Sequence, residues 1–152
     1  MRGDYHTHST LDDGKNSLEE MAAAARAAGL THFGFSGHSY CPLEEDYCIP
    51  REKIPEYLAR ARAVQARYAG EMEVFVGLEL DLLGERPEGL DYAIGSVHTI
   101  CGGDGRHFAV DESPETARQC VEEFFGGDWY RYTDAYYDQV ALLPERTGGD
   151  WI

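Results

Sequence analysis

VFVGLEL, residues 74–80, is the stretch that decides the fold, because it is an apolar run with a single carboxylate, Glu79, next to its end. A short run of this kind is typical of a strand that is buried on both faces of a parallel sheet. THFGFS at residues 31–36 and YAIGSVH at residues 92–98 have the same build. Functional side chains of parallel strands gather at the carboxyl ends of the strands. The three runs therefore predict a parallel sheet with polar groups along one edge, namely His38, Glu79 and His98.

The first eight residues form a fourth candidate strand, and its end carries two histidines. In GDYHTH, residues 3–8, side chains two positions apart share a face, so His6 and His8 line up with Asp4. Two imidazoles on one face can hold a metal ion, although two histidines can also end an ordinary solvated strand. Asp4 is expected either to orient one imidazole or to accept backbone amides. Because four consecutive strand candidates end in His or Glu, the metal site is the favoured interpretation.

Amphipathic helices are predicted between and after these strands. SLEE, residues 17–20, has the capping-box pattern, and Gly29 can close this first helix in a left-handed conformation. A second helix is predicted over residues 51–69, and a third opens at Ser113 and ends at Gly126. The apolar face of a fourth helix, capped by Asp128, is expected to lie in the core and consists of Trp129, Tyr132, Tyr136, Val140 and Leu143.

Alternating strands and helices predict an α/β fold, a parallel sheet whose natural closure is a barrel. A closed α/β barrel takes more than about 200 residues, so a chain of 152 residues supplies part of one. GGDWI, residues 148–152, indicates a turn and the start of a fifth strand. We therefore expect one domain over residues 1–152, an N-terminal portion truncated after about four to five strands. Its open edge and uncovered apolar faces predict marginal stability and self-association of the isolated chain.

The motifs taken together resemble the polymerase and histidinol phosphatase (PHP) superfamily. Their order and spacing are specific, and the resemblance covers essentially the whole chain. Within the superfamily, the chain is most similar to the histidinol-phosphate phosphatase branch. The motifs that carry this resemblance are DYHTH at residues 4–8, DGKNSLEEM at residues 13–21, GFSGHS at residues 34–39 and GSVH at residues 95–98.

The resemblance implies a distorted seven-stranded β/α barrel that hydrolyses phosphate esters, by hydroxide attack on phosphorus, at a centre of up to three divalent ions. It implies that His6 and His8 hold one ion and that Glu79 bridges it to a second ion held by His98. Asp13 and His38 would bind the third ion, and Asp13, Glu79 and His98 would carry catalysis. The family completes these sites with a further His and a late Asp-x-His pair, which lie beyond this sequence. Imidazole and carboxylate ligands leave zinc, manganese and iron open as the metal.

Several further polar residues are candidates for lesser roles. Lys15 follows Asp-Gly near the predicted site, and Arg86 and Arg106 lie in loops from which a guanidinium could pair with a phosphate. Solvated loop arginines are the ordinary alternative. His107 shares the loop of Arg106 and could reach substrate from there. Asp81 shares a strand face with Glu79 and is either a support for the site or a surface residue.

Composition limits the partners. The 28 acidic residues outnumber the 13 basic ones and give a net charge of -15, which argues against a nucleic-acid surface and favours a small phosphorylated substrate. No run is long enough to span a bilayer and no leader is evident, so we expect no membrane partner and a cytoplasmic location. The cysteines lack Cys-x-x-Cys spacing and are expected to be free thiols: Cys41, Cys48, Cys101 and Cys120.

Three functional hypotheses follow. The favoured one is a metal-dependent phosphatase acting on histidinol phosphate, a step of histidine biosynthesis, or on another small phosphomonoester. The second is a phosphodiesterase or nuclease of the same superfamily, and the third is an inactive, truncated metal-binding fragment. A binuclear amidohydrolase is disfavoured because such enzymes often bridge their metals with a strand-end lysine, whereas Lys15 and Lys53 lie outside the predicted strands.

Overall fold

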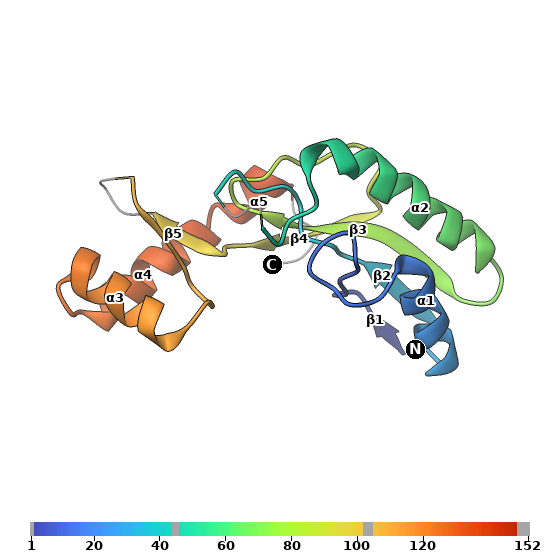
Figure 1. Cartoon of the computed structure of the whole chain (residues 1–152), viewed down its shortest axis with the longest axis horizontal. Helices are drawn as coiled ribbons and strands as arrows, with labels where there is room; N and C mark the ends of the chain where they lie inside the picture. Colours follow the sequence, from blue (N-terminus) through green and yellow to red (C-terminus); the bar gives the residue numbers. More distant parts are fainter. Residues whose placement is uncertain (1, 44–45, 102–104, 149–152) are drawn as a thin grey trace.

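The structure is a computed structural model that describes residues 2–43, 46–101 and 105–148. In these ranges four parallel strands lie in the order β1, β2, β3, β4 and form half of a barrel, with helices α1 and α2 packed beside them (Figure 1). The predicted partial barrel of parallel strands is confirmed. The bounds are β1 (Gly3–Asp4), α1 (Leu18–Ala27), β2 (His32–Phe35), a 3₁₀ turn η1 (Arg51–Lys53), α2 (Ile54–Arg67), β3 (Glu73–Asp81) and β4 (Tyr92–Ser96). We call residues 2–98 the sheet lobe.

The chain then leaves the parallel sheet and builds a second region, residues 99–140, which we call the arm. It consists of an antiparallel pair, β5 (Thr99–Cys101) and β6 (His107–Ala109), and of α3 (Pro114–Phe125) and α4 (Trp129–Val140). Figure 1 shows α3 and α4 at the opposite end of the molecule from α1 and α2. The last helix, α5 (Leu143–Thr147), returns to the sheet and packs on β4.

Local signals in the sequence account for the helix ends. Ser17 and Glu20 form the predicted capping box, in which the Ser17 hydroxyl accepts from Glu20 N–H and the Glu20 carboxylate accepts from Ser17 N–H. Ser113 caps α3, and Gly126 ends it in the left-handed conformation that glycine adopts without strain. Gly29, with φ of 76°, follows α1 in the same way. These features were readable from sequence because they depend on neighbouring residues alone.

Several predicted boundaries were wrong. The first strand ends at Asp4, so His6 and His8 follow β1 rather than lie in it, and the strand predicted over residues 92–98 ends at Ser96. The second helix begins with the 3₁₀ turn η1 and ends at Arg67. The fifth strand predicted from Asp150 lies outside the described residues.

The fourth helix differs most from the prediction. It ends at Val140, and Leu143 belongs to α5, where it is buried against β4. No residue of α4 itself is buried, and Trp129, a member of the predicted face, is 49% exposed. The expectation of an aromatic core face was therefore wrong. The 3.6-residue period indicated an amphipathic helix, but α3, which packs Phe125 against Tyr132, covers that face only in part.

The hydrophobic core lies between the sheet and the two helices of the sheet lobe. Its largest fully buried side chains come from α1, β2, the loop before α2, α2 and β3, and they are Leu18, Phe33, Phe35, Ile49, Tyr57, Leu78 and Leu80. The continuous apolar pattern of β3 is thus explained, because most of the strand is covered on both faces.

The Tyr92 ring, on β4, occupies space left by two glycines, Gly77 on the adjacent strand β3 and Gly34 on β2. A Cβ atom at Gly34 or Gly77 would lie only 2.4 Å from the Tyr92 side chain. The Tyr92 hydroxyl lies 2.6 Å from the carbonyl oxygen of Tyr5 and 2.9 Å from that of Phe35. Gly34 and Gly77 are therefore required for the close approach of this ring.

Among the described residues, no helix combines the length and the apolar character that a membrane span requires. The four cysteines are free thiols, as predicted.

Candidate metal centre

The site is built around the carboxylate of Glu79, which is 5% exposed near the end of β3. Four imidazoles surround it. The distances to its oxygens are 2.8 Å from His6 Nε2, 3.2 Å from His98 Nε2, 3.4 Å from His38 Nδ1 and 3.6 Å from His8 Nε2. His98 faces Oε1, whereas the other three rings face Oε2. The two oxygens thus point toward different groups of donors, as a bridging carboxylate requires.

Parallel strand pairing brings His38 to Glu79. Beyond the end of β2, the two residues form a β-bridge, with Ser39 N–H donating to the Glu79 carbonyl at 2.8 Å and Glu79 N–H donating to the Gly37 carbonyl at 3.1 Å. The buried hydroxyl of Tyr57, on α2, accepts from Gly37 N–H at 3.3 Å and donates to the Gly77 carbonyl at 2.7 Å. The helix thus holds the backbone that presents His38.

Thr7 explains why the two histidines beside it face the site. Its backbone N–H donates to Ser36 Oγ at 2.7 Å and its hydroxyl donates to the Gly34 carbonyl at 2.8 Å, so its side chain is bound to β2 and the turn that follows. His6 and His8 project the other way, with ring centroids 5.2 Å apart. The predicted alternation therefore persists beyond the strand. Asp4 accepts the His6 backbone amide at 3.2 Å, which is the backbone alternative left open by the sequence.

Two buried carboxylates contact the outer nitrogens of the histidines. Asp81 Oδ2 lies 3.3 Å from His98 Nδ1, so Asp81 supports the site rather than lying on the surface. Asp12 Oδ2 lies 2.7 Å from His8 Nδ1. Sequence reasoning missed Asp12, although its place four residues after His8 and beside Asp13 was a usable signal. Asp13 is half exposed, with Oδ1 3.5 Å from His8 Nδ1 and 3.9 Å from His38 Nε2.

The charges of these groups are strongly coupled. Burial alone would raise the pKa of Glu79, but the hydrogen bond with His98 and the surrounding imidazoles outweigh it and lower that pKa to about 2. Burial opposes protonation of His98, yet Asp81 and Glu79 raise its pKa to about 10. Burial lowers the pKa of His38. The centre therefore keeps its central carboxylate ionised.

The donor set fits divalent metal ions. Three overlapping groups have one donor atom per residue within 4.8 Å of one another: His6, His8 and Glu79; His8, Asp13 and His38; and His38, Glu79 and His98. The buried Nδ1 of His38 has no hydrogen-bond partner among the described residues, although it faces Glu79. A buried lone pair without a donor is costly unless a cation satisfies it. Imidazole and carboxylate together suit zinc, iron and manganese.

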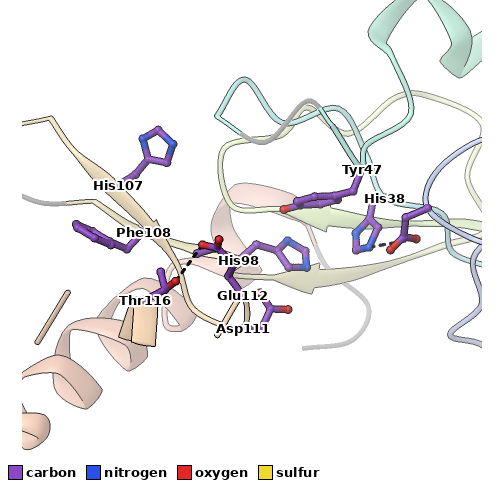
Figure 2. A pocket seen from close by; sticks show the side chains of 10 residues that line it. His38, Tyr47, His98, His107, Phe108, Asp111, Glu112 and Thr116 are labelled. Atoms are coloured by element: carbon purple, nitrogen blue, oxygen red, sulfur yellow. Dashed lines mark hydrogen bonds and ion pairs between the residues drawn. The ribbon is translucent and has the colours of Figure 1, made fainter. Parts of the chain in front are cut away.

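A cavity of about 480 Å³ extends from this cluster toward the arm. Figure 2 shows His38, His98 and Tyr47 on one side of it, and His107, Phe108 and Thr116 on the other. The Tyr47 ring packs against both histidines, at centroid distances of 4.8 Å from His38 and 5.7 Å from His98. The sequence offered no signal for Tyr47, because its loop position is not periodic. The cavity continues to the start of α3, where its lining includes Asp111 and Glu112.

The candidate substrate residues lie in different places. His107 lines the cavity from β6, whereas the sequence had placed it in a loop. Arg106 pairs with Glu123 and stacks on the Phe124 ring, and Arg86 donates to the Thr147 and Gly148 carbonyls at the end of α5. Lys15, Arg86 and Arg106 are not among the residues that line this cavity. Their role toward substrate stays a prediction.

Comparisons with known proteins agree with this architecture. The PHP domain model matches residues 4–148. A probable histidinol-phosphatase of Deinococcus radiodurans is 33% identical, over 92% of this chain and 54% of its own length. The DNA polymerase/3'-5' exonuclease PolX of Bacillus subtilis is 31% identical over 93 residues, which are 60% of this chain and 15% of that protein.

Two solved structures share the fold. A putative histidinol phosphatase from Listeria monocytogenes superposes with a TM-score of 0.77 at 18% identity, over 93% of this chain and 60% of that one. Histidinol phosphate phosphatase from Lactococcus lactis, crystallised with zinc, L-histidinol and phosphate, gives a TM-score of 0.52 at 24% identity, over 81% of this chain and 54% of that one. The chain thus spans about half the length of the histidinol phosphatases it matches. From the family model, which covers nearly all of its residues, we conclude that the chain belongs to the PHP domain family.

Proposed function

We propose that this chain carries the metal centre of a metal-dependent phosphomonoesterase. The observation that carries the proposal is the buried Glu79 carboxylate with four imidazoles around it. A structural ion pair needs one imidazole per carboxylate, whereas four converging donors suit a cluster of cations. The proposed ligands are His6, His8, Asp13, His38, Glu79 and His98.

Each ligand has a distinct task in this proposal. His6 and His8 hold one ion, and Glu79 shares that ion with a second one at His98. Asp13 and His38 hold a third. Divalent ions at these positions would neutralise phosphate oxygens, make water a better nucleophile and stabilise the departing alkoxide. The low pKa of Glu79 keeps its charge available throughout the neutral range.

We further propose histidinol phosphate as the substrate. The relative from Deinococcus radiodurans is named a probable histidinol-phosphatase, which supports this choice. The cavity supports it too, because its lining includes Asp111 and Glu112 and, among the described residues, no arginine or lysine. Such a lining suits a substrate that carries cationic groups besides its phosphate. Histidinol phosphate has an ammonium group on the carbon next to its phosphate-bearing methylene and an imidazole at the end opposite the phosphate.

A nuclease is the second candidate, favoured by the likeness to PolX. Nucleic-acid backbones are bound mainly through Lys and Arg, and contact with acidic walls repels them. The net charge of -15 and the acidic far wall of the cavity therefore weigh toward the small substrate.

The test compares Glu79→Gln with Glu73→Gln, which makes the same change at the exposed beginning of the same strand. Metal content and turnover of histidinol phosphate are measured on the 152-residue chain in added zinc or manganese. We expect Glu79→Gln to lose metal and to lower turnover by about 100-fold or more, because the charge between the cations is gone. Glu73→Gln is expected to behave as wild type.

Other outcomes would contradict specific parts of the proposal. Wild-type metal content in Glu79→Gln excludes this residue as a ligand. Metal binding by the wild type without turnover of any phosphomonoester supports the hypothesis of an inactive metal-binding fragment and rejects turnover by these 152 residues alone. Cleavage of single-stranded DNA in preference to histidinol phosphate supports the nuclease.

A further inference from the structure

We propose that Asp12 is a positioning residue of the metal centre, which fixes the tautomer of His8 and its place relative to His38. The inference rests on the proposed metal centre and deepens it. It concerns a residue that contacts the ligands and not the reacting atoms. The observation that carries it is the set of four contacts made by one fully buried carboxylate.

Both oxygens of Asp12 are occupied. Oδ1 accepts from Ser9 N–H at 2.8 Å and from the Ser9 hydroxyl at 3.1 Å. Oδ2 lies 2.7 Å from His8 Nδ1 and accepts from His38 N–H at 3.2 Å. The side chain is 0% exposed, so water does not compete for these contacts. A carboxylate satisfied in this way has one orientation.

The first consequence is the tautomer of His8. An ionised carboxylate only accepts hydrogen bonds, so the proton of the neutral ring must lie on Nδ1. The Nε2 lone pair is then directed to the Glu79 carboxylate, 3.6 Å away. Two groups of lone pairs facing each other repel unless a cation lies between them. Asp12 therefore prepares His8 as a metal ligand through Nε2.

The second consequence is the spacing between two loops. His8 follows β1 and His38 follows β2, yet the same Asp12 oxygen binds the ring of one and the backbone of the other. Their ring centroids are 4.4 Å apart. A shift of either loop would break a contact with a buried charge, which is costly. Thr7 already binds the chain before His8 to Gly34 and Ser36, and Asp12 adds a direct link between the His8 ring and the His38 backbone.

The adjacent residues Asp12 and Asp13 have different roles in this inference: Asp12 holds the His8 ring, and Asp13 is open to a cation. The Asp13 side chain is 51% exposed, and its Oδ1 is 3.5 Å from His8 Nδ1 and 3.9 Å from His38 Nε2. It remains available to a cation and lines the cavity. Asp12 has no such access. Asp81 contacts Nδ1 of His98 in the same way as Asp12 contacts Nδ1 of His8. A carboxylate therefore holds the outer nitrogen of a histidine on both sides of Glu79.

The test uses Co²⁺ as the probe, because its visible absorption reports its ligands. The variant Asp12→Asn is compared with Asp134→Asn, an identical change at an exposed position of α4. We expect Asp12→Asn to weaken Co²⁺ binding by about 10- to 100-fold. Asp134→Asn should bind as wild type. Thermal unfolding of both variants is recorded alongside.

A second measurement needs no variant. Long-range ¹⁵N NMR of the metal-free wild type, at a pH where the His8 ring is neutral, identifies its protonated nitrogen. A proton on Nδ1 is expected, and a proton on Nε2 overturns the inference even if Asp12→Asn does not fold.

The outcomes separate this inference from the proposed function. Wild-type Co²⁺ affinity in Asp12→Asn, together with lost affinity in Glu79→Gln, overturns the positioning role and leaves the metal centre standing. Weakened binding in Asp12→Asn by a protein without phosphatase turnover supports the positioning role and rejects the enzyme. A wild-type chain that binds no Co²⁺ overturns both.

Discussion

The sheet lobe and the arm differ in how many of their side chains are buried. Every member of the main core cluster belongs to the sheet lobe, from Leu18 on α1 to Ala93 on β4. In the arm, the described residues that are fully buried are few: Thr99, Ile100, Cys120 and Val121. The helix α4 buries none of its residues. Since burial of apolar surface is the main source of stability, the two regions should differ widely in resistance to opening.

The two regions contribute different parts of the cavity. The proposed ligands all lie in the sheet lobe, Glu79 on β3 and the others on loops, and strand pairing and the buried Tyr57 of α2 hold the loop of His38. The far wall of the cavity lies in the arm, at β6 and the start of α3. Ligand geometry demands rigidity, whereas a wall that contacts substrate can tolerate small movements. The comparison shows that one cavity can combine a rigid set of proposed ligands with a less tightly packed wall.

The largest effect is expected from Leu78→Ala in β3, where the side chain is fully buried. Leu-to-Ala changes in a core cost about 2–5 kcal/mol, so the unfolding free energy of the sheet lobe should fall by about 3 kcal/mol. Chemical denaturation measures it, with Leu83→Ala as the exposed control.

Val121→Ala, at a buried position in α3, then tests whether the regions are independent. It should speed hydrogen exchange in α3 and α4 while the unfolding midpoint of the sheet lobe stays unchanged. An equal loss of stability in both regions would make them one cooperative unit and remove the comparison.

A smaller effect is expected from Asp91→Asn, which tests a polar contribution to the sheet lobe. Asp91 accepts from Arg62 at 2.7 Å, Gln65 at 3.0 Å and Val76 N–H at 2.8 Å. Burial opposes ionisation, but these hydrogen bonds outweigh it and lower the pKa of Asp91 below its ordinary value of 3.8. We expect a loss of about 1–2 kcal/mol at neutral pH.

The pH dependence of this loss has a definite sign. A carboxylate with a lowered folded pKa stabilises the fold above its unfolded pKa, and the contribution disappears as the pH falls through the folded value. The difference in unfolding free energy between wild type and Asp91→Asn should therefore be constant near neutrality and shrink below about pH 4. A difference that grows on acidification would reject this account.

The smallest effect concerns the arm and the substrate. Glu112→Gln removes one charge from the exposed far wall of the cavity and should raise KM for histidinol phosphate by up to about fivefold, as an exposed ion pair contributes about 1 kcal/mol or less. The turnover number and the KM for phenyl phosphate, which has no cation, should not change. Glu115→Gln, one turn away on α3 and outside the cavity lining, is the matched control. An equal rise of KM for both substrates would contradict cation recognition.

Much of the sheet lobe could be predicted from sequence because its signals are local. The apolar run at residues 74–80 identified β3, and the capping box identified the start of α1. The convergence of His6, His38 and Glu79 followed from a general property of parallel sheets, that their carboxyl ends meet at one edge. The predicted convergence of these side chains is seen in the structure, even though His6 lies beyond the end of β1.

The arm and the supporting residues could not be predicted in the same way. Residues 92–101 contain apolar residues on both sides of Ser96 and His98, and only tertiary pairing decides that the chain leaves the parallel sheet after Ser96 to form β5 with β6. The face of α4 has the right period, but a period does not reveal whether another element covers it. The sequence places Asp12 four residues after His8, but its contacts with the His8 ring and the His38 backbone follow only from the three-dimensional structure of the loop.

The side chain of Tyr92 limits the curvature of the four-stranded sheet. Adjacent strands lie about 4.8 Å apart, so in a flat sheet the outer strands β1 and β4 would be about 14 Å apart, beyond the reach of one side chain. The Tyr92 hydroxyl contacts the Tyr5 carbonyl at 2.6 Å, so the sheet must curve enough to bring the chain after β1 within reach of β4. His6 follows Tyr5 directly. A phenol on one edge strand thereby determines how far the first histidine stands from Glu79, and any redesign of the curvature would have to alter Tyr92, Gly34 and Gly77 together.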